Sequence, residues 1–328
     1  MNLKSKQLIS IIVGCLPALL LAQQLSQRTQ FDINKLAYNP AVAGSENYVP
    51  VVLNVRKQWI GFDEAPSSQT ISAHGYVSKG LGLGVVINND VAGPFRNSGF
   101  SFSTARHFKV AQISRNQFTW LSFGMGGLLY KYLIDESKLT TTQQSDPAIA
   151  KLVAGNSRLT FDLSFGLLLS HKDLYVGISA FNLMQSKRDL YTDNFNNNNL
   201  KRMYNLMAGY KYKLSQNAML EPALLIKYTE SGVLQTDILA KLHYGILYGG
   251  LVFRPGDAMA GLFGIEVDRF FSINYSYDYN VNDLNAYSQG SHEVSLRIKI
   301  FEPVSRNGEI KKERERPNLN KKGRGKRN

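Results

Sequence analysis

The sequence predicts an all-β protein, a transmembrane antiparallel up-and-down β-barrel of about 14 strands. Three observations support this class. Apolar and polar residues alternate along most of the chain, the alternating segments are long, and the connections between them differ systematically in length. Because alternation with a period of two places one set of side chains on each face of a strand, each segment has one apolar and one polar wall.

The clearest alternation lies at 271–280, where Phe, Ile and Tyr residues alternate with Ser, Asn and Asp. Residues 159–169 and 293–300 repeat the pattern. A soluble β-sandwich would also alternate, but its strands usually have about 5–6 residues. Several segments here are longer and match the ~9–11 residues that cross a bilayer. Length therefore favours a membrane barrel over a soluble β-domain.

The number of predicted strands is even, as a closed bacterial barrel requires when both termini lie on one side. They are expected at residues 48–59, 68–77, 81–89, 98–109, 118–134, 157–171, 174–183, 201–214, 218–230, 233–244, 246–255, 258–268, 270–280 and 290–301.

Connections after even-numbered strands are mostly short, although the one after the fourth strand is somewhat longer. The long connections all follow odd-numbered strands and lie at 60–67, 89–97, 135–156, 184–200 and 281–289. Two connections after odd-numbered strands, near 231–232 and 255–257, are short and weaken this asymmetry. Short periplasmic turns and long outer loops are typical of outer-membrane barrels. Both termini are therefore expected in the periplasm and the long loops outside the cell.

The two predicted walls differ in chemistry. Aromatic residues near strand ends fit interfacial girdles, although ordinary core tyrosines are the alternative: Trp59, Tyr76, Tyr130, Tyr132, Tyr175, Tyr210, Tyr212, Tyr228, Tyr244, Tyr248 and Tyr279. The charged residues expected to face the lumen are Arg56, Asp162, Lys211, Glu221, Lys227, Asp237, Lys241, Glu266, Asp278, Glu293 and Arg297. A barrel lumen can hydrate or pair these charges, whereas a soluble two-sheet core could not bury them cheaply.

The regions outside the barrel are distinct. Residues 1–22 resemble a signal peptide, with a charged start, an apolar stretch at 8–21 and cleavage after Ala22. Cys15 lies inside that stretch, so the mature chain would have no cysteine for disulfides, catalysis or metal binding. Residues 23–47 are predicted to cap or plug the periplasmic mouth of the barrel, which spans 48–301. Residues 302–328 are predicted to form a basic, disordered periplasmic tail.

The net charge of +13 arises partly from that tail, because residues 301–328 hold ten basic and four acidic residues. A basic tail often binds nucleic acid, but a secreted protein leaves the nucleic-acid compartment, so nucleic acid is not an expected partner. The alternatives are a solvated tether or a segment that binds peptidoglycan or a protein partner.

No catalytic, cofactor or metal site is predicted, and the protein is not expected to be an enzyme. The histidines are scattered along the chain without metal-binding spacing. Ser291 and His292 are neighbours on a strand and face opposite walls, so they cannot easily form a hydrolytic pair. Glycines inside strands, at 82, 84, 124, 126 and 127, are expected to permit close packing and barrel curvature.

Several long motifs, taken in order, resemble those of one known family. Residues 38–45, Tyr38-Asn39-Pro40-Ala41-Val42-Ala43-Gly44-Ser45, resemble its "NPAYAGS" signature. Residues 56–62, Arg56-Lys57-Gln58-Trp59-Ile60-Gly61-Phe62, with Ala65-Pro66 and Ser72-Ala73-His74, resemble its "RKQWvGFdgAPttqtfSaH" stretch. Tyr275-Ser276-Tyr277-Asp278-Tyr279 and Gly290-Ser291-His292-Glu293 match "GYSYDY…SGSHEi". In this order the motifs resemble the PorP/SprF family. Val42 and Asn274 depart modestly from its pattern, and the tail extends beyond its usual end.

The resemblance implies an outer-membrane component of the type IX secretion system, linked in some members to gliding motility. It implies partners in the periplasmic ring and lipoproteins of that machinery and in the C-terminal domain of a secreted adhesin. The expected mechanism is docking without catalysis, and the alternative is a passive porin or small-hydrophobe channel. The candidate partner-binding residues, each of which also has a purely structural interpretation, are Tyr38, Asn39, Pro40, Gly44, Arg56, Gln58, Trp59, Gly61, Pro66, Asp278, Gly290, His292 and Glu293.

Overall fold

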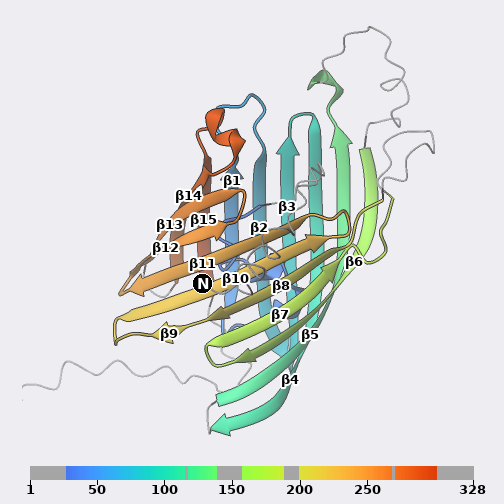
Figure 1. Cartoon of the computed structure of the whole chain (residues 1–328). Helices are drawn as coiled ribbons and strands as arrows, with labels where there is room; N and C mark the ends of the chain where they lie inside the picture. Colours follow the sequence, from blue (N-terminus) through green and yellow to red (C-terminus); the bar gives the residue numbers. More distant parts are fainter. Residues whose placement is uncertain (1–26, 115–116, 139–156, 188–198, 268–269, 301–328) are drawn as a thin grey trace, which may run out of the picture.

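The chain folds into a closed antiparallel β-barrel of 14 strands, described here from a computed structural model that covers residues 27–114, 117–138, 157–187, 199–267 and 270–300 (Figure 1). The predicted signal peptide and basic tail lie outside these residues. The labelled strands are β1 (Val49–Lys57), β2 (Ser67–Ser78), β3 (Leu81–Ala92), β4 (Phe95–Ser114), β5 (Gln117–Ile134), β6 (Ser157–His171), β7 (Leu174–Phe181), β8 (Met203–Tyr210), β9 (Tyr212–Lys213), β10 (Ala218–Thr229), β11 (Leu234–Tyr244), β12 (Leu247–Arg254), β13 (Ala258–Val267), β14 (Phe271–Asn280) and β15 (Ser291–Ile300).

Apart from β8 and β9, every strand pairs with its neighbours in sequence, and β1 pairs with β15 to close the ring. β8 and β9 both pair with β10 and are separated only by Lys211, so they count as one interrupted strand. The predicted fold class and strand number are therefore confirmed. Within the described part of the chain, no helix is long and apolar enough to span a membrane.

The barrel has two unlike ends. At the turn end, β2 is followed by β3, β4 by β5, β6 by β7, β9 by β10, β11 by β12 and β13 by β14, and β1 begins and β15 ends there. At the loop end, β1 is followed by β2, β3 by β4, β5 by β6, β7 by β8, β10 by β11, β12 by β13 and β14 by β15.

Two predicted connections were wrong. Residues 89–97 were expected to form a long loop, but β3 and β4 continue their pairing until Ala92 faces Phe95. The connection between the fourth and fifth strands was also predicted to be longer, but β4 pairs with β5 until Ser114 faces Gln117. In the β3–β4 hairpin the ladder continues through polar residues such as Asn89 and Asp90, because backbone pairing does not require apolar side chains.

Burial follows the predicted alternation. In β14, Ile273 and Tyr275 are exposed on the outer wall, whereas Asn274 and Ser276 are buried inside the barrel. The girdle assignment of Tyr248 was wrong, because this residue is buried toward the lumen. Lys211, which interrupts the strand between β8 and β9, is exposed at the turn end.

The centre of the barrel is occupied by residues 27–48. The buried apolar cluster of the molecule joins Phe31, Leu36 and Tyr38 of this segment to inward residues of the wall such as Leu168 and Leu225. Two short 3-10 helices, η1 (Lys35–Ala37) and η2 (Pro40–Val42), fold the segment inside the ring. Further short 3-10 helices, η3 (Glu136–Lys138) and η4 (Asp283–Ala286), lie in loop-end connections.

Candidate functional site

Three strand glycines, Gly82, Gly84 and Gly124, lie against the N-terminal segment, and we call them the glycine seat. A Cβ built on Gly124 of β5 would lie 2.2 Å from the backbone nitrogen of Ala41. A Cβ on Gly82 of β3 would lie 2.0 Å from the carbonyl oxygen of Ala43, and one on Gly84 would lie 2.9 Å from the Leu36 side chain. At Gly82 and Gly124 the neighbouring atoms belong to the backbone, so a side chain does not fit there. The glycines therefore create the space for this segment, which goes beyond the curvature role expected from the sequence.

Asn39 joins the segment to the wall. Its side-chain oxygen accepts a hydrogen bond from the Ala41 N–H at 2.8 Å and caps η2, where Pro40 occupies the first helical position. Its side-chain amide donates to the carbonyl oxygens of Leu167 on β6, at 2.9 Å, and Ile178 on β7, at 3.2 Å. The Asn39-Pro40 motif thus shapes the segment and also attaches it to two strands.

The adjoining backbone is held by wall side chains. The carbonyl oxygen of Tyr38 accepts hydrogen bonds from Ser179 at 2.5 Å and from Asn205 at 3.0 Å. The N–H of Gly44 donates to Nδ1 of His74 at 3.1 Å, and Gly44 has a φ of +72° that favours glycine. Four members of the predicted site set, Tyr38, Asn39, Pro40 and Gly44, therefore lie together inside the barrel.

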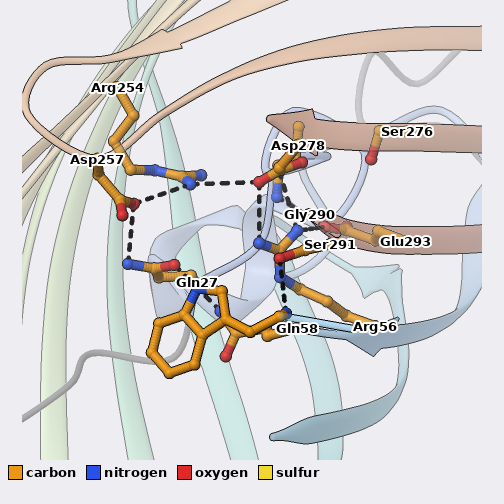
Figure 2. A network of polar contacts seen from close by, with 12 residues as sticks. Gln27, Arg56, Gln58, Arg254, Asp257, Ser276, Asp278, Gly290, Ser291 and Glu293 are labelled. Atoms are coloured by element: carbon orange, nitrogen blue, oxygen red, sulfur yellow. Dashed lines mark hydrogen bonds and ion pairs between the residues drawn. The ribbon is translucent and has the colours of Figure 1, made fainter. Parts of the chain in front are cut away.

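A second group of predicted residues forms a buried ion cluster near the loop end (Figure 2). Arg56 of β1 pairs with Asp278 of β14 at 2.8 Å and with Glu293 of β15 at 3.1 Å. Thr29 of the N-terminal segment binds both carboxylates, because its N–H donates to Glu293 and its hydroxyl donates to Asp278. The cluster thus ties the N-terminal segment to both sides of the barrel seam.

Arg254 of β12, which was not among the residues predicted from the sequence, extends this cluster. Its guanidinium lies 3.2 Å from Asp257 and 3.3 Å from Asp278 (Figure 2). It also contacts Asp237 at 2.5 Å. Lys227 reaches Asp237 at 3.6 Å. An unpaired charge buried here would cost several kcal/mol, so mutual pairing is what makes this interior possible.

Two further ion pairs attach the N-terminal segment nearer the turn end. Asp32 pairs with Lys241 of β11, which also lies 3.3 Å from Glu221. Glu46 pairs with Arg297 of β15 at 2.8 Å. Burial alone would raise the pKa of Glu46, but the Arg297 guanidinium outweighs it and holds this pKa well below its usual range. The segment therefore contributes anions that wall cations require.

A third group of predicted residues joins two loop-end connections. The Ile60 N–H donates to the carbonyl oxygen of Gly290 at 2.9 Å, and the Gln289 N–H donates to that of Ile60 at 2.6 Å. The N–H of Trp59 donates to the Ser291 hydroxyl at 3.1 Å. These bonds fasten the β1–β2 connection to the β14–β15 connection, and we call the joined pair the loop clasp (58–66 and 281–290).

Three predicted residues complete the clasp. The carbonyl oxygen of Pro66 accepts a hydrogen bond from the Gln58 N–H at 2.8 Å. The Gln58 side chain donates to Gln27 at 3.0 Å, which links the clasp to the N-terminal segment. Gly61 has a φ of +108°, and a Cβ there would lie 3.3 Å from the carbonyl oxygen of Tyr287.

His292 is the exception among the predicted residues. It faces the outer wall, where its Nδ1 lies 2.7 Å from the Tyr275 hydroxyl. The alternation of β15 explains this separation from Ser291 and Glu293, which are buried on the inner side.

A buried serine–histidine pair also lies inside the barrel. Ser122 lies 2.7 Å from Nδ1 of His107, but both residues are buried and Nε2 of His107 lies 2.9 Å from the Ala43 carbonyl oxygen. This pair therefore helps to seat the N-terminal segment. Within the described ranges, no group of three or more His, Cys, Asp or Glu residues could hold a metal ion.

The motif residues that meet in the lumen and the loop clasp also fall within a sequence match to a known family. The model of the type IX secretion system membrane protein PorP/SprF matches residues 20–298. The chain belongs to the PorP/SprF family. In this PorP/SprF protein, the matched range includes the glycine seat, the ion cluster and the loop clasp. Family and fold together place it in the outer membrane.

This PorP/SprF protein was also compared with curated proteins and with solved structures. No curated protein matches the chain. The Acinetobacter baumannii outer membrane protein Omp33 is 8% identical, with a TM-score of 0.43 over 78% of this chain and 100% of that chain. The Ralstonia pickettii toluene transporter TbuX is 9% identical, with a TM-score of 0.46 over 81% of this chain and 93% of that chain.

Proposed function

We propose that this protein supports the secretion and surface attachment of adhesin-type cargo by docking, without catalysis. Membership of the type IX secretion family supplies the process. The observation that carries the docking mode is the occupied lumen, in which Asn39, Arg56 and Thr29 bind the N-terminal segment to the wall on several sides. The cargo would therefore contact the outside of the barrel ends.

Barrel size supports the same mode. A barrel of this strand number leaves a lumen too narrow for a folded domain. Here residues 27–48 fill much of that lumen, and Phe31, Ala41 and Val42 are buried. An exported chain would have to displace these residues and separate the buried ion pairs. Passage through another component of the secretion machinery avoids that cost.

The loop clasp is the surface that we propose for the cargo C-terminal domain. It is held rigidly by backbone hydrogen bonds, and it exposes Phe62, at 40%, and Tyr287, at 74%. Exposed aromatic residues on a rigid support are typical anchors of protein interfaces. The turn end would then face the periplasmic ring and lipoproteins of the machinery.

The test combines a deletion strain with complementing variants. Wild-type protein should restore the surface adhesin, and a Phe62→Ser/Tyr287→Ser variant should release it to the medium, with at least a fivefold loss of surface signal expected when two anchors of about 1 kcal/mol or more are removed. Tyr244→Ser is the matched control, because Tyr244 is 67% exposed but lies at the turn end. Normal surface adhesin in the deletion strain would overturn the secretion role.

The rival function is a passive porin or small-hydrophobe channel. The occupied lumen predicts that the purified protein shows no steady ion conductance in planar bilayers. A variant lacking residues 27–47 should conduct if it still forms a heat-modifiable barrel. Steady conductance by the wild-type protein would favour the channel.

A further inference from the structure

The β4–β5 hairpin extends past both of its neighbours at the turn end of the barrel (Figure 1). On one side, pairing with β3 ends where Leu81 faces Arg106, although β4 continues to Ser114. On the other side, pairing with β6 ends where His171 faces Thr119. The part of β4 beyond His107 therefore has a partner strand on the β5 side only, within the described residues.

This arrangement leaves a free strand edge. The His107 N–H donates to the carbonyl oxygen of Gly80 at 2.7 Å, so the backbone polar groups of residue 107 point toward β3. Strand alternation directs those of Lys109 to the same side, where the described residues provide no strand. The pairing with β5 is regular from His107 to Lys109, and its register shifts between Lys109 and Ala111 and again between Gln112 and Ser114, so Lys109 is the position at which the edge is extended and open. A free edge of this kind binds extended peptides by β-strand addition.

The side chains along the edge are apolar and basic. Phe108 and Val110 are 46% and 52% exposed, and Arg106 and Lys109 are also exposed. Nζ of Lys109 lies 3.3 Å from the centre of the Phe118 ring, which holds this cation beside the edge. The edge thus offers backbone pairing, apolar contact and positive charge together.

The surroundings of the hairpin are basic as well. The exposed charged residues of the described turn end are Lys79, Arg106, Lys109, Lys172, Lys211 and Lys213, whereas Asp173 and Glu266 are only partly exposed. We propose that the free edge of β4 binds an extended, acidic segment of a partner protein by β-strand addition. The site deepens the docking role proposed above, because it would be the contact of the turn end with the secretion machinery.

Charge disfavours the other occupants of this edge. Two copies paired edge to edge would bring Arg106 and Lys109 of one copy toward the same residues of the other, and like charges on facing strands repel. The chain beyond residue 300 has ten basic and four acidic residues from 301 onward, so the same repulsion opposes its binding here. An acidic partner strand meets no such repulsion.

The test uses the full mature protein in detergent and a fluorescent synthetic peptide of alternating valine and glutamate, followed by anisotropy. The wild-type protein should bind this peptide, with affinity falling as salt rises, and should not bind a peptide of alternating valine and lysine. Lys109→Pro removes one edge N–H and should weaken binding about tenfold. Lys109→Gln keeps that N–H and should lose only the few-fold contribution of one exposed charge.

A second measurement keeps the proposal falsifiable if Lys109→Pro fails to fold. A photo-crosslinking residue at Val110 should label the acidic peptide, whereas the same residue at Val176, on the outer wall of β7, should not. Equal labelling at both positions, equal binding by wild type and a folded Lys109→Pro variant, or no binding by the wild type would overturn the proposal. The peptide assay needs no cargo, so its result is separate from that of the adhesin experiment.

Discussion

The side-chain oxygen of Asn39 occupies the space that a side chain on Gly166 would need, since a Cβ at residue 166 would lie 2.1 Å from it. The Asn39 amide stands in the same relation to Gly177, at 2.7 Å. A motif residue of the N-terminal segment and glycines of two strands therefore form one joint. The joint explains why the chain carries glycine within strands that would otherwise favour β-branched residues.

The glycine seat predicts a large effect from one methyl group. Gly124→Ala places a Cβ against the backbone of Ala41, which cannot give way as a flexible side chain can. We expect a loss of about 1–3 kcal/mol in the free energy of unfolding, and faster proteolysis of the N-terminal segment. Gly261→Ala is the control, because a Cβ there meets nothing within 4 Å. Equal stability of the two variants would contradict the seat.

Replacing Asn39 should lower the free energy of unfolding by more than the loss of a side chain of this size would. Asn39→Ala removes the cap of η2 and leaves the carbonyl oxygens of Leu167 and Ile178 without this donor. We expect destabilisation of about 2–4 kcal/mol, measured by urea unfolding in detergent. The control is Asn285→Ala, which removes one exposed side-chain bond to Tyr279. Similar losses in both variants would show that Asn39 does not attach the segment.

The buried ion cluster predicts strong dependence on Arg56. Arg56→Met leaves Asp278 and Glu293 buried with fewer cations, so we expect about 3–5 kcal/mol of destabilisation. The exposed pair of Arg202 with Glu230 provides the comparison, and Arg202→Met should cost less than about 1 kcal/mol. Heat-modifiable gel migration gives the melting temperature of each variant. A melting temperature for Arg56→Met close to that of Arg202→Met would rule out a stabilising role for the cluster.

The ion pair of Glu46 with Arg297 should make the stability of the fold decrease at acidic pH. Because Arg297 lowers the pKa of Glu46 in the folded protein, the ionised form stabilises the fold above the ordinary glutamate pKa of about 4.3. This contribution is lost as the pH falls through the lowered pKa. The stability gap between wild type and Glu46→Gln should therefore be constant from about pH 7 to pH 5 and should narrow below about pH 4. A gap that does not change down to pH 3 would refute this pair.

Much of the barrel could be predicted from sequence because its rules are local. The alternation in 271–280 follows from strand geometry and needs no knowledge of neighbours. The strand ends were less predictable, as the β3–β4 hairpin shows, because its ladder continues through polar residues such as Asn89 and Asp90. Backbone pairing there depends on the partner strand, which composition does not reveal.

The candidate site was only partly predictable. Motif resemblance identified Asn39, Arg56 and Asp278, but it did not indicate that Asn39 and Arg56 belong to separate clusters or that His292 faces outward. Arg254 and Thr29 were missed because both meet Asp278, which lies 24 positions from Arg254 and 249 positions from Thr29 in the sequence. Strand glycines at 82, 84 and 124 were the available signal, and they were interpreted as aids to curvature.

The sequence by itself determined the all-β class, the number of strands and the two unlike walls, because these follow from periodicity along a single chain. Only the tertiary structure decided what fills the ring. The contacts of Asn39 with Gly166 and of Arg56 with Asp278 join residues 127 and 222 positions apart, and such pairings depend on the closure of the barrel around its own N-terminal segment. Local patterns contain no information about that closure, since each partner is also compatible with its strand or loop alone.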